Sequence, residues 1–222
     1  MKEHRIKNFQ DFHNLINHRS FRTLYRGHSN VDWKLVPKTG RSPYLKLSEK
    51  TTLDYFKRSS MPYLKISPQN DWDWLTLAQH YGIPTRLLDW TSNPLVAAFF
   101  AVEEEFDCDA AIYKYDYQSR IKLEATDPFT VKNIQVVTPF ASSERVLRQK
   151  GNFTVHPEPT IEFVKPKTNE SLEKLIIEKK YKPLLRAELR TYGITQFEIY
   201  GDIDGLSKYI NWRNTFIDDL GT

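Results

Sequence analysis

The sequence predicts an α+β fold in a single domain that spans residues 1–222, and three observations predict it. Segments with the period of a strand and segments with the period of a helix both occur, and the strands are concentrated in separate groups. No internal repeat, low-complexity tract or linker divides the chain. Of the 222 residues 40% are hydrophobic and 14% aromatic, so the chain can build one packed core.

Helices dominate the predicted structure of residues 1–81. Apolar residues at helical spacing predict helices at residues 8–17, 48–60 and 73–81. Alternating apolar and polar residues predict a strand at 21–26, which Gly27 ends. We expect an ordered loop after this strand, with Trp33 as its hydrophobic anchor.

Residues 86–102 combine a strand, a capping signal and an apolar run. The strand predicted at 86–92 ends in four residues of which three are polar, Asp89 to Ser92. Ser92 or Asn93 can cap a helix, and Pro94 suits its first turn. The eight apolar residues that follow predict a helix that is buried all round. Polar groups at such a buried corner are costly unless each is satisfied, so they form either a structural network or a site.

Strands and helices also alternate in the predicted second half. Strands are expected at residues 110–115, 134–138, 161–164 and 196–200, with a strand, turn and strand at 143–155 hinged on Gly151. Helices are expected at 170–180, at 183–192 before Gly193, and from Asp204 onward.

Composition limits the partners of this protein. Lys and Arg outnumber Asp and Glu by 32 to 28, a net charge of +4 that is compatible with an anionic partner without specifying one. Cys108 is the single cysteine, which excludes an intrachain disulfide framework and a cysteine-rich zinc site and fits a reducing compartment. The six histidines are scattered, so no metal site is expected.

The hydropathy and the motifs of the sequence exclude further classes of protein. Residues 1–16 contain no continuous apolar segment, and the longest apolar run is too short to span a bilayer. We therefore expect a cytoplasmic protein of bacterial or viral type that has no membrane partner. The sequence contains no GxGxxG, GxxxxGK[ST], HExxH, GxSxG or CxxC motif, which removes the usual support for nucleotide-fold, zincin, hydrolase and thioredoxin functions.

Candidate site residues gather around the central stretch. A Gly/Pro turn at 80–86 carries His80, Tyr81 and Arg86, and the strand end carries Asp89. Such groups are often structural, but convergent polar groups beside an apolar wall are also typical of a ligand site. Arg26, at the end of the first predicted strand, is either a surface residue or an anion clamp, because a guanidinium offers a planar fork of donors.

These residues give the chain a resemblance to FRG-domain proteins. The matching elements extend over a core at about 21–210. They are Tyr25–Ser29 with Trp33, Leu35 and Pro37; His80–Ala101; Arg145 with Gln149, Gly151 and Phe153; and Gly193–Ile194 with Asp202–Leu206. The resemblance implies one FRG domain over residues 1–222.

The order of the elements is similar, more distantly, to that of the ADP-ribosyltransferase fold, which implies a split β-sheet core with peripheral helices. Arg26 matches the arginine of the first strand in those enzymes, and Thr91-Ser92 matches a polar strand end. In the third element, at 143–153, Arg145 stands where the catalytic glutamate is expected, and Glu144 is one residue away. Glu144 after a bulge, Gln149 or Glu198 could replace that glutamate.

The resemblance implies an NAD-dependent ADP-ribosyltransferase-like enzyme, a bacterial or phage toxin or defence effector that uses NAD as substrate and modifies nucleic acid or protein. The catalytic residues it implies are Arg26, Thr91, Glu144 and Gln149. The NAD-binding residues it implies are Arg26, Gly27, His28, His80, Tyr81, Arg86, Asp89 and Ser92.

The alternative hypothesis is a non-catalytic FRG module that binds nucleic acid or another anionic ligand through the same pocket. The missing glutamate favours it. Both hypotheses predict that Arg26, His80, Asp89 and Thr91 lie around one cleft, although up to 65 positions separate them in the chain.

Overall fold

A computed structural model describes residues 1–17, 20–104, 107–138 and 144–219 of the chain. For residues 144–145 and 216–219 it describes the backbone alone. Among the described helices none is long and apolar enough to cross a membrane.

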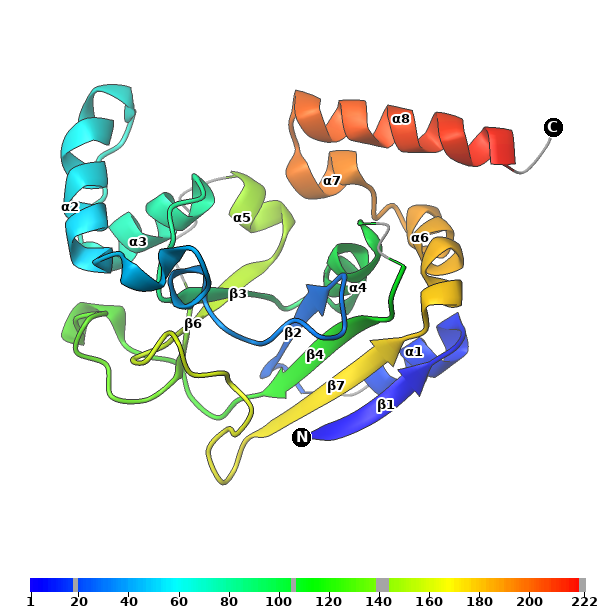
Figure 1. Cartoon of the computed structure of the whole chain (residues 1–222), viewed down its shortest axis with the longest axis horizontal. Helices are drawn as coiled ribbons and strands as arrows, with labels where there is room; N and C mark the ends of the chain where they lie inside the picture. The colour runs from blue at the N-terminus through cyan, green and yellow to red at the C-terminus, as the bar shows by residue number, and fades with distance from the viewer. Residues whose placement is uncertain (18–19, 105–106, 139–143, 220–222) are drawn as a thin grey trace.

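The centre of the molecule is one mixed sheet of seven strands in the order β1-β7-β4-β2-β3-β6-β5 (Figure 1). Neighbouring strands are antiparallel except β1 and β7, which run parallel. The strands are β1 (Lys2–Ile6), β2 (Thr23–His28), β3 (Leu87–Thr91), β4 (Ala110–Asp116), β5 (Gln135–Val137), β6 (Gly151–Val155) and β7 (Ser171–Ile177).

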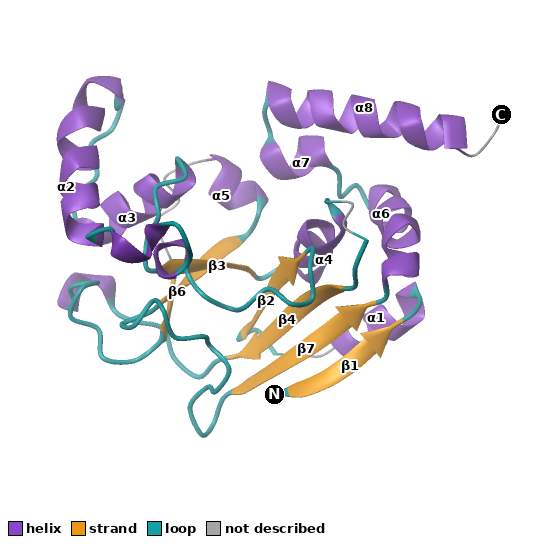
Figure 2. Cartoon of the chain, viewed as in Figure 1, coloured by secondary structure: helices purple, strands orange, loops and turns teal. Residues whose placement is uncertain are grey.

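The helices lie near different parts of the sheet: α3 and α5 near β3 and β6, and α4 and α1 near β2 and β1 (Figure 2). Helix α4 packs directly on β2 and also contacts α6, whereas α3 packs near β3. The helices are α1 (Phe9–Ile16), α2 (Glu49–Ser60), α3 (Asp71–His80), α4 (Pro94–Val102), α5 (Glu144–Arg148), α6 (Lys182–Thr191), α7 (Gln196–Tyr200) and α8 (Ile203–Asp219). The α+β prediction is confirmed.

The sheet narrows at its middle, between β2 and β3. These two strands share a single paired position, Tyr25 with Thr91. By contrast, six positions pair β2 with β4 and five pair β3 with β6. The sheet is therefore almost divided into two parts, and after Tyr25 the backbone edge of β2 that faces β3 is unpaired, although the other edge still pairs with β4.

Glycine 27 allows α4 to lie close against β2. A Cβ atom at this position would lie 2.0 Å from the carbonyl oxygen of Ala97 and 2.6 Å from the amide nitrogen of Ala101. Both contacts are to backbone, which cannot move aside as a side chain could. Because only glycine permits this approach, Gly27 fixes the distance between the helix and the strand that carries Arg26.

The core is built from α4 and the sheet, as the apolar run predicted. Val96 to Phe99, Ala101 and Val102 are buried against residues of β4, β7 and α6. A second cluster lies around Trp90, Tyr115 and Phe163, whose rings contact one another. Helix α4 begins at Pro94, and the side chain of Asn93 caps it by accepting from the amide of Leu95 at 3.0 Å.

Most elements predicted before residue 140 are confirmed, and most errors fall after it. The predicted helices at 8–17, 48–60 and 73–81 correspond to α1, α2 and α3, and the predicted strands at 21–26, 86–92, 110–115 and 134–138 correspond to β2, β3, β4 and β5. Strand β1 was not predicted. Trp33 does not anchor its loop, because it is 44% exposed while Leu35 is fully buried.

The predicted helix at 170–180 is wrong, because residues 171–177 form β7. Leu172, Leu175 and Ile176 follow helical spacing in the sequence, which produced the error. In the structure β7 lies between β1 and β4, and its residues 175–177 are buried in succession. An internal strand covered on both faces lacks the alternation that identifies an exposed strand.

Three further strand predictions in this half are wrong. Residues 196–200 form α7, which Thr195 caps by accepting from the amide of Glu198, and which ends at Gly201 with a positive φ of 67°. The described part of 143–149 is the short helix α5, so only the second predicted strand of that hairpin exists, as β6. Residues 161–164 are irregular.

Candidate functional site

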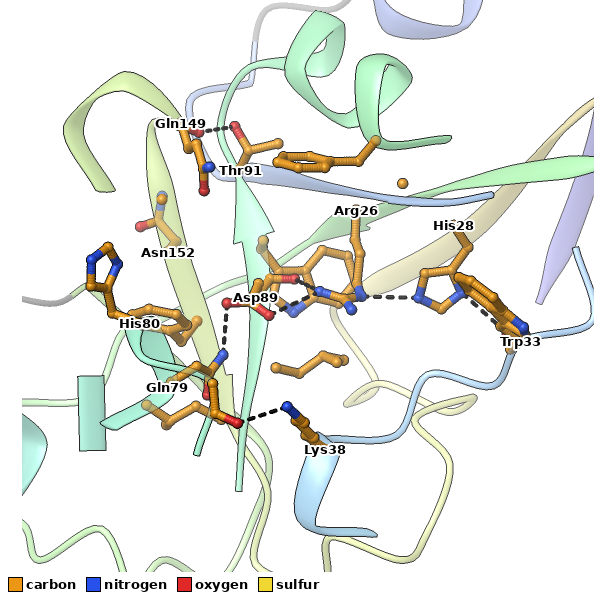
Figure 3. Close-up of a pocket in the computed structure, with 18 of the residues that line it drawn as sticks. Arg26, His28, Trp33, Lys38, Gln79, His80, Asp89, Thr91, Gln149 and Asn152 are labelled. Atoms are coloured by element: carbon orange, nitrogen blue, oxygen red, sulfur yellow. Dashed lines mark hydrogen bonds and ion pairs between the residues drawn. The ribbon is translucent and has the colours of Figure 1, made fainter. Parts of the chain in front are cut away.

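A pocket of about 580 Å³ lies where β2 and β3 part. Its volume falls within the range of small-molecule sites. The strands supply its floor, the end of α3 and the loop at 33–44 supply one side, and the end of α4 and the segment 146–153 supply the other (Figure 3). Its polar lining includes Arg26, His28, Lys38, Arg41, Gln79, His80, Asp89, Thr91, Gln149 and Asn152.

Arg26 and Asp89 meet at the middle of the pocket across the gap between β2 and β3 (Figure 3). Nη1 of Arg26 donates to the backbone oxygen of Asp89 at 2.7 Å and lies 3.4 Å from the carboxylate oxygen Oδ2. Burial lowers the pKa of Arg26, and Asp89 opposes that shift. Arg26 thus links β2 to β3 beyond the single position at which these strands pair.

His28 holds the other side of the Arg26 guanidinium. Nε of Arg26 donates to Nε2 of His28 at 3.0 Å, and Nδ1 of His28 lies 3.2 Å from the carbonyl oxygen of Trp33. Since Nε2 accepts, Nδ1 carries the proton and donates to that carbonyl. Burial, together with the charge of Arg26, lowers the pKa of His28 to about 2, so the ring is neutral.

Gln79 fixes the carboxylate from the side of α3. Its Nε2 donates to Oδ1 of Asp89 at 2.6 Å, and its Oε1 accepts from the hydroxyl of Thr85. Each oxygen of Asp89 therefore faces a different donor, one on α3 and one on β2. The Asp89 side chain nevertheless remains 60% exposed, whereas that of Arg26 is only 16% exposed.

Thr91 organises the corner at the end of β3. Its hydroxyl donates to the carbonyl oxygen of Gln149 at 2.7 Å and accepts from the amide of Asn93 at 3.0 Å. It therefore ties the start of α4 to the segment before β6. The polar strand end noted in the sequence is a satisfied network that also forms one wall of the pocket.

Cations line the side of the pocket nearest the loop at 33–44. Nε of Arg41 donates to the carbonyl oxygen of Val36 at 2.7 Å, and Nζ of Lys38 donates to that of Gly82 at 2.7 Å. Burial lowers the pKa of Arg41, and the charge of Arg26 lowers it further. With Arg26, these residues give the pocket a region suited to an anion.

Acidic groups in the described lining are Asp89, Glu103 and Glu104. Glu103 accepts from the hydroxyl of Tyr200 at 2.6 Å, and burial raises the pKa of its carboxyl. Glu104 lies on the exposed surface after α4. Among the described residues, no group of three or more His, Cys, Asp or Glu side chains is arranged to hold a metal ion.

The structure brings most of the predicted site residues together. Arg26, Gly27, His28, His80, Asp89, Thr91 and Gln149 all line the pocket. The predicted convergence of Arg26, His80, Asp89 and Thr91 is therefore confirmed, although their roles remain predictions. They converge because the end of α3 and two facing strands meet at one gap.

Three predicted residues, Tyr81, Arg86 and Ser92, are outside the described lining of the pocket. Tyr81 is 66% exposed and packs beside the His80 ring. Arg86 pairs with Glu49, Nε to Oε2 at 2.8 Å, and its guanidinium lies 4.6 Å from the Phe129 ring centroid. Ser92 is exposed, because Asn93 caps the helix. The side chain of Glu144, and that of Arg145, lie outside the described residues.

Glu198, an alternative carboxylate, is also outside the described lining. It lies on α7, where its Oε2 is 3.8 Å from Nη1 of Arg148. Glu198 was predicted to lie on a strand at 196–200, and this prediction is wrong because those residues form α7.

Sequence reasoning missed Gln79, Lys38, Arg41 and Asn152. Gln79 directly precedes His80, so the turn that identified His80 could have included it. Lys38 and Arg41 form a basic pair in the sequence PKTGR. Asn152 had no signal of its own, because it depends on the pairing of β6 with β3.

Fold and pocket together define an α+β domain built around a polar cleft between two partly separated strands. Residues 21–110 match the family model of the FRG domain, which supports the resemblance over that part of the chain. The match covers β2, α2, α3, β3 and α4, and stops before β6. No curated protein and no solved structure matches this chain.

Proposed function

We propose that the protein is an NAD-dependent ADP-ribosyltransferase-like enzyme and that NAD binds in the pocket between β2 and β3. One observation carries the proposal. Arg26 on β2, Thr91 at the end of β3 and Gln149 before β6 come from the three segments that resemble transferase elements, and all three line one pocket. Their sequence positions alone did not require this convergence.

The chemistry of the lining supports a dinucleotide substrate. NAD carries a diphosphate, and Arg26, Arg41 and Lys38 supply positive charge on one side of the pocket. The described hydrogen bonds of the Arg26 side chain use Nε and Nη1, which leaves Nη2 to donate to a phosphate oxygen. The aromatic rings of Trp33, Tyr44 and Phe153 also line the pocket and can pack against a base or the nicotinamide ring.

In the proposed reaction the bond between ribose C1′ and the nicotinamide nitrogen breaks. Nicotinamide leaves with the bonding electron pair as a neutral molecule, and positive charge develops on the ribose. An oxygen or nitrogen of the acceptor then bonds to C1′ and loses its proton to water. The acceptor is a nucleic acid or a protein, and water as acceptor gives hydrolysis to ADP-ribose. The proposal extends to a role as a bacterial or phage toxin or defence effector.

Two measurements on purified protein test the proposal. The first is calorimetric titration with NAD, and the second is nicotinamide release, with and without RNA, DNA or a protein extract. We expect Arg26→Lys to weaken NAD binding by at least about tenfold, because lysine keeps the charge but loses the planar donor fork. Arg190→Lys, on the exposed last turn of α6, is the matched control and should bind as the wild type does.

Two outcomes would contradict the proposal. Absence of both NAD binding and nicotinamide release in the wild type would refute it. If Arg26→Lys instead weakened the binding of a nucleic acid while NAD bound to neither protein, the non-catalytic module would be the better hypothesis.

A further inference from the structure

We propose that Asp89 is the carboxylate that faces the reacting ribose, and that Arg26 and Gln79 position it. This inference rests on the proposed function and identifies the group that replaces the missing glutamate. It also changes the interpretation of Asp89, which the resemblance placed only among the NAD-binding residues.

The first observation is the difference in exposure between the two members of the ion pair. Arg26 is the buried partner, while the side chain of Asp89 is 60% exposed although it lies in the middle of a strand. Its neighbours Leu88 and Trp90 are both buried. On β3 the carboxylate is therefore the group that projects into the pocket, as Figure 3 shows.

The second observation is the support behind the carboxylate. Oδ1 accepts from Gln79 and Oδ2 faces Arg26, so the carboxylate plane is fixed from two directions. Thr85 holds Gln79, and His28 holds Arg26, which extends the network to the carbonyl of Trp33. A charged group fixed before substrate arrives needs no reorganisation when charge develops, which is the basis of electrostatic catalysis.

Two of the lone-pair positions of Asp89 remain for a ligand. An ionised carboxylate offers about four acceptor positions, and the described donors are Gln79 and Arg26. The positive charge of Arg26 would weaken the effect of Asp89 on a cationic sugar. Binding of the diphosphate to Nη2 of Arg26 would balance that charge, so the charge of Asp89 would act on the ribose.

Two other described carboxylates, Glu103 and Glu198, are less suited to this role. Glu103 accepts a hydrogen bond from the hydroxyl of Tyr200. Burial raises the pKa of the Glu103 carboxyl, which disfavours its charged form. Glu198 lies outside the described lining. Glu144 is the carboxylate that the sequence resemblance proposes for this role. The test therefore compares Glu144→Gln directly with Asp89→Asn.

Asp89 would act when the bond from C1′ to nicotinamide breaks. It would stabilise the positive charge on the ribose through space and, on this proposal, would form no bond to C1′. The proton lost by the acceptor goes to water, so Asp89 takes up no proton in this step.

The test compares Asp89→Asn, Glu144→Gln and wild type for NAD affinity by calorimetry and for the rate of nicotinamide release. We expect Asp89→Asn to lower kcat by at least about 100-fold, in line with loss of a main electrostatic stabiliser. Its NAD dissociation constant should stay within about threefold, because the asparagine oxygen still accepts from one neighbour and Arg26 keeps its hydrogen bond to the backbone oxygen at position 89. Asp54→Asn, exposed on α2, is the control and should retain wild-type kcat. Asp89→Asn should lower kcat more than Glu144→Gln does.

Rescue by an added anion separates a catalytic role from a structural one. Asp89→Ala leaves space for a small carboxylate, so sodium formate should restore part of the lost rate. A side chain that only supported the fold would show no such rescue. The melting temperatures of the Asp89 variants establish that they are folded.

The outcomes separate the role of Asp89 from the proposed function of the protein. Nicotinamide release by Asp89→Asn within about threefold of wild type would refute the role of Asp89. The same holds if only Glu144→Gln loses activity, or if formate fails to restore folded Asp89→Ala. In all three cases the proposed function survives, because wild type still cleaves NAD. Absence of NAD cleavage by wild type would instead overturn the proposed function and this inference with it.

Discussion

Acidification should destabilise this protein through two buried neutral histidines, His28 and His156. Burial and the charge of Arg26 lower the pKa of His28 to about 2 and that of His156 to about 3, against 6.5 for an exposed histidine. In the unfolded chain both rings take up a proton as the pH falls below 6.5, whereas in the folded protein neither does. Their contribution to stability is therefore complete above pH 6.5 and is lost as the pH falls toward the folded pKa values.

The magnitude follows from the size of these shifts. Each ring that stays neutral in the fold costs about 1.4 kcal/mol per pH unit below 6.5, or about 2 kcal/mol at about pH 5. The two together then lower the free energy of unfolding by about 4 kcal/mol, a large part of the total of about 5–15 kcal/mol for a domain. The effect is therefore large enough to measure.

Denaturant unfolding at several pH values between about 7.5 and 5 measures this effect. His156→Gln should remove about half of the pH dependence, because it removes one of the two buried rings. His156 is outside the described lining of the pocket, and its Nε2 lies 2.9 Å from the Thr154 hydroxyl. His13→Gln, on the exposed side of α1, is the matched control and should leave the slope unchanged. An unaltered slope in His156→Gln would refute the argument that a buried neutral ring causes the acid sensitivity.

Two further predictions concern the packing around the pocket. Gly27→Ala should lower the free energy of unfolding by about 3 kcal/mol or more in denaturant unfolding, because its Cβ would lie 2.0 Å from a backbone oxygen of α4; a change below about 1 kcal/mol would show that α4 moves easily. Glu49→Gln should destabilise the fold by about 3 kcal/mol, since it leaves Arg86 buried without its charge partner. NAD binding should persist in that folded variant, and loss of NAD binding would indicate that Arg86 contributes to the NAD site.

Local signals determined the elements of the first half of this fold except β1. The capping residues around Pro94 and the eight apolar residues after it identify α4, because capping and apolar periodicity act within a few residues. The same holds for β3 and for the turn that carries His80. The FRG resemblance also depends on local motifs, and the matched segment, 21–110, coincides with this half.

Elements whose burial depends on distant partners could not be predicted locally. The sequence of β7 predicts a helix because its apolar residues recur at helical spacing. Only pairing with β1 and β4 makes this segment a strand. In α7 the capping Thr195 and the terminal Gly201 are visible in the sequence, but five residues are too few to show helical periodicity.

For the site, the sequence by itself identified three residues that line the pocket: Arg26 on the first predicted strand, His80 in a turn and Asp89 on the next predicted strand. Only the tertiary structure decided how they are used. The gap between β2 and β3 lets Arg26 reach across to Asp89, and α3 brings Gln79 to the second carboxylate oxygen. Residue identity fixes what a side chain can donate or accept, whereas burial and the direction of each neighbour fix which group remains exposed to a ligand. That is why the arginine is the buried partner here and the carboxylate faces the pocket.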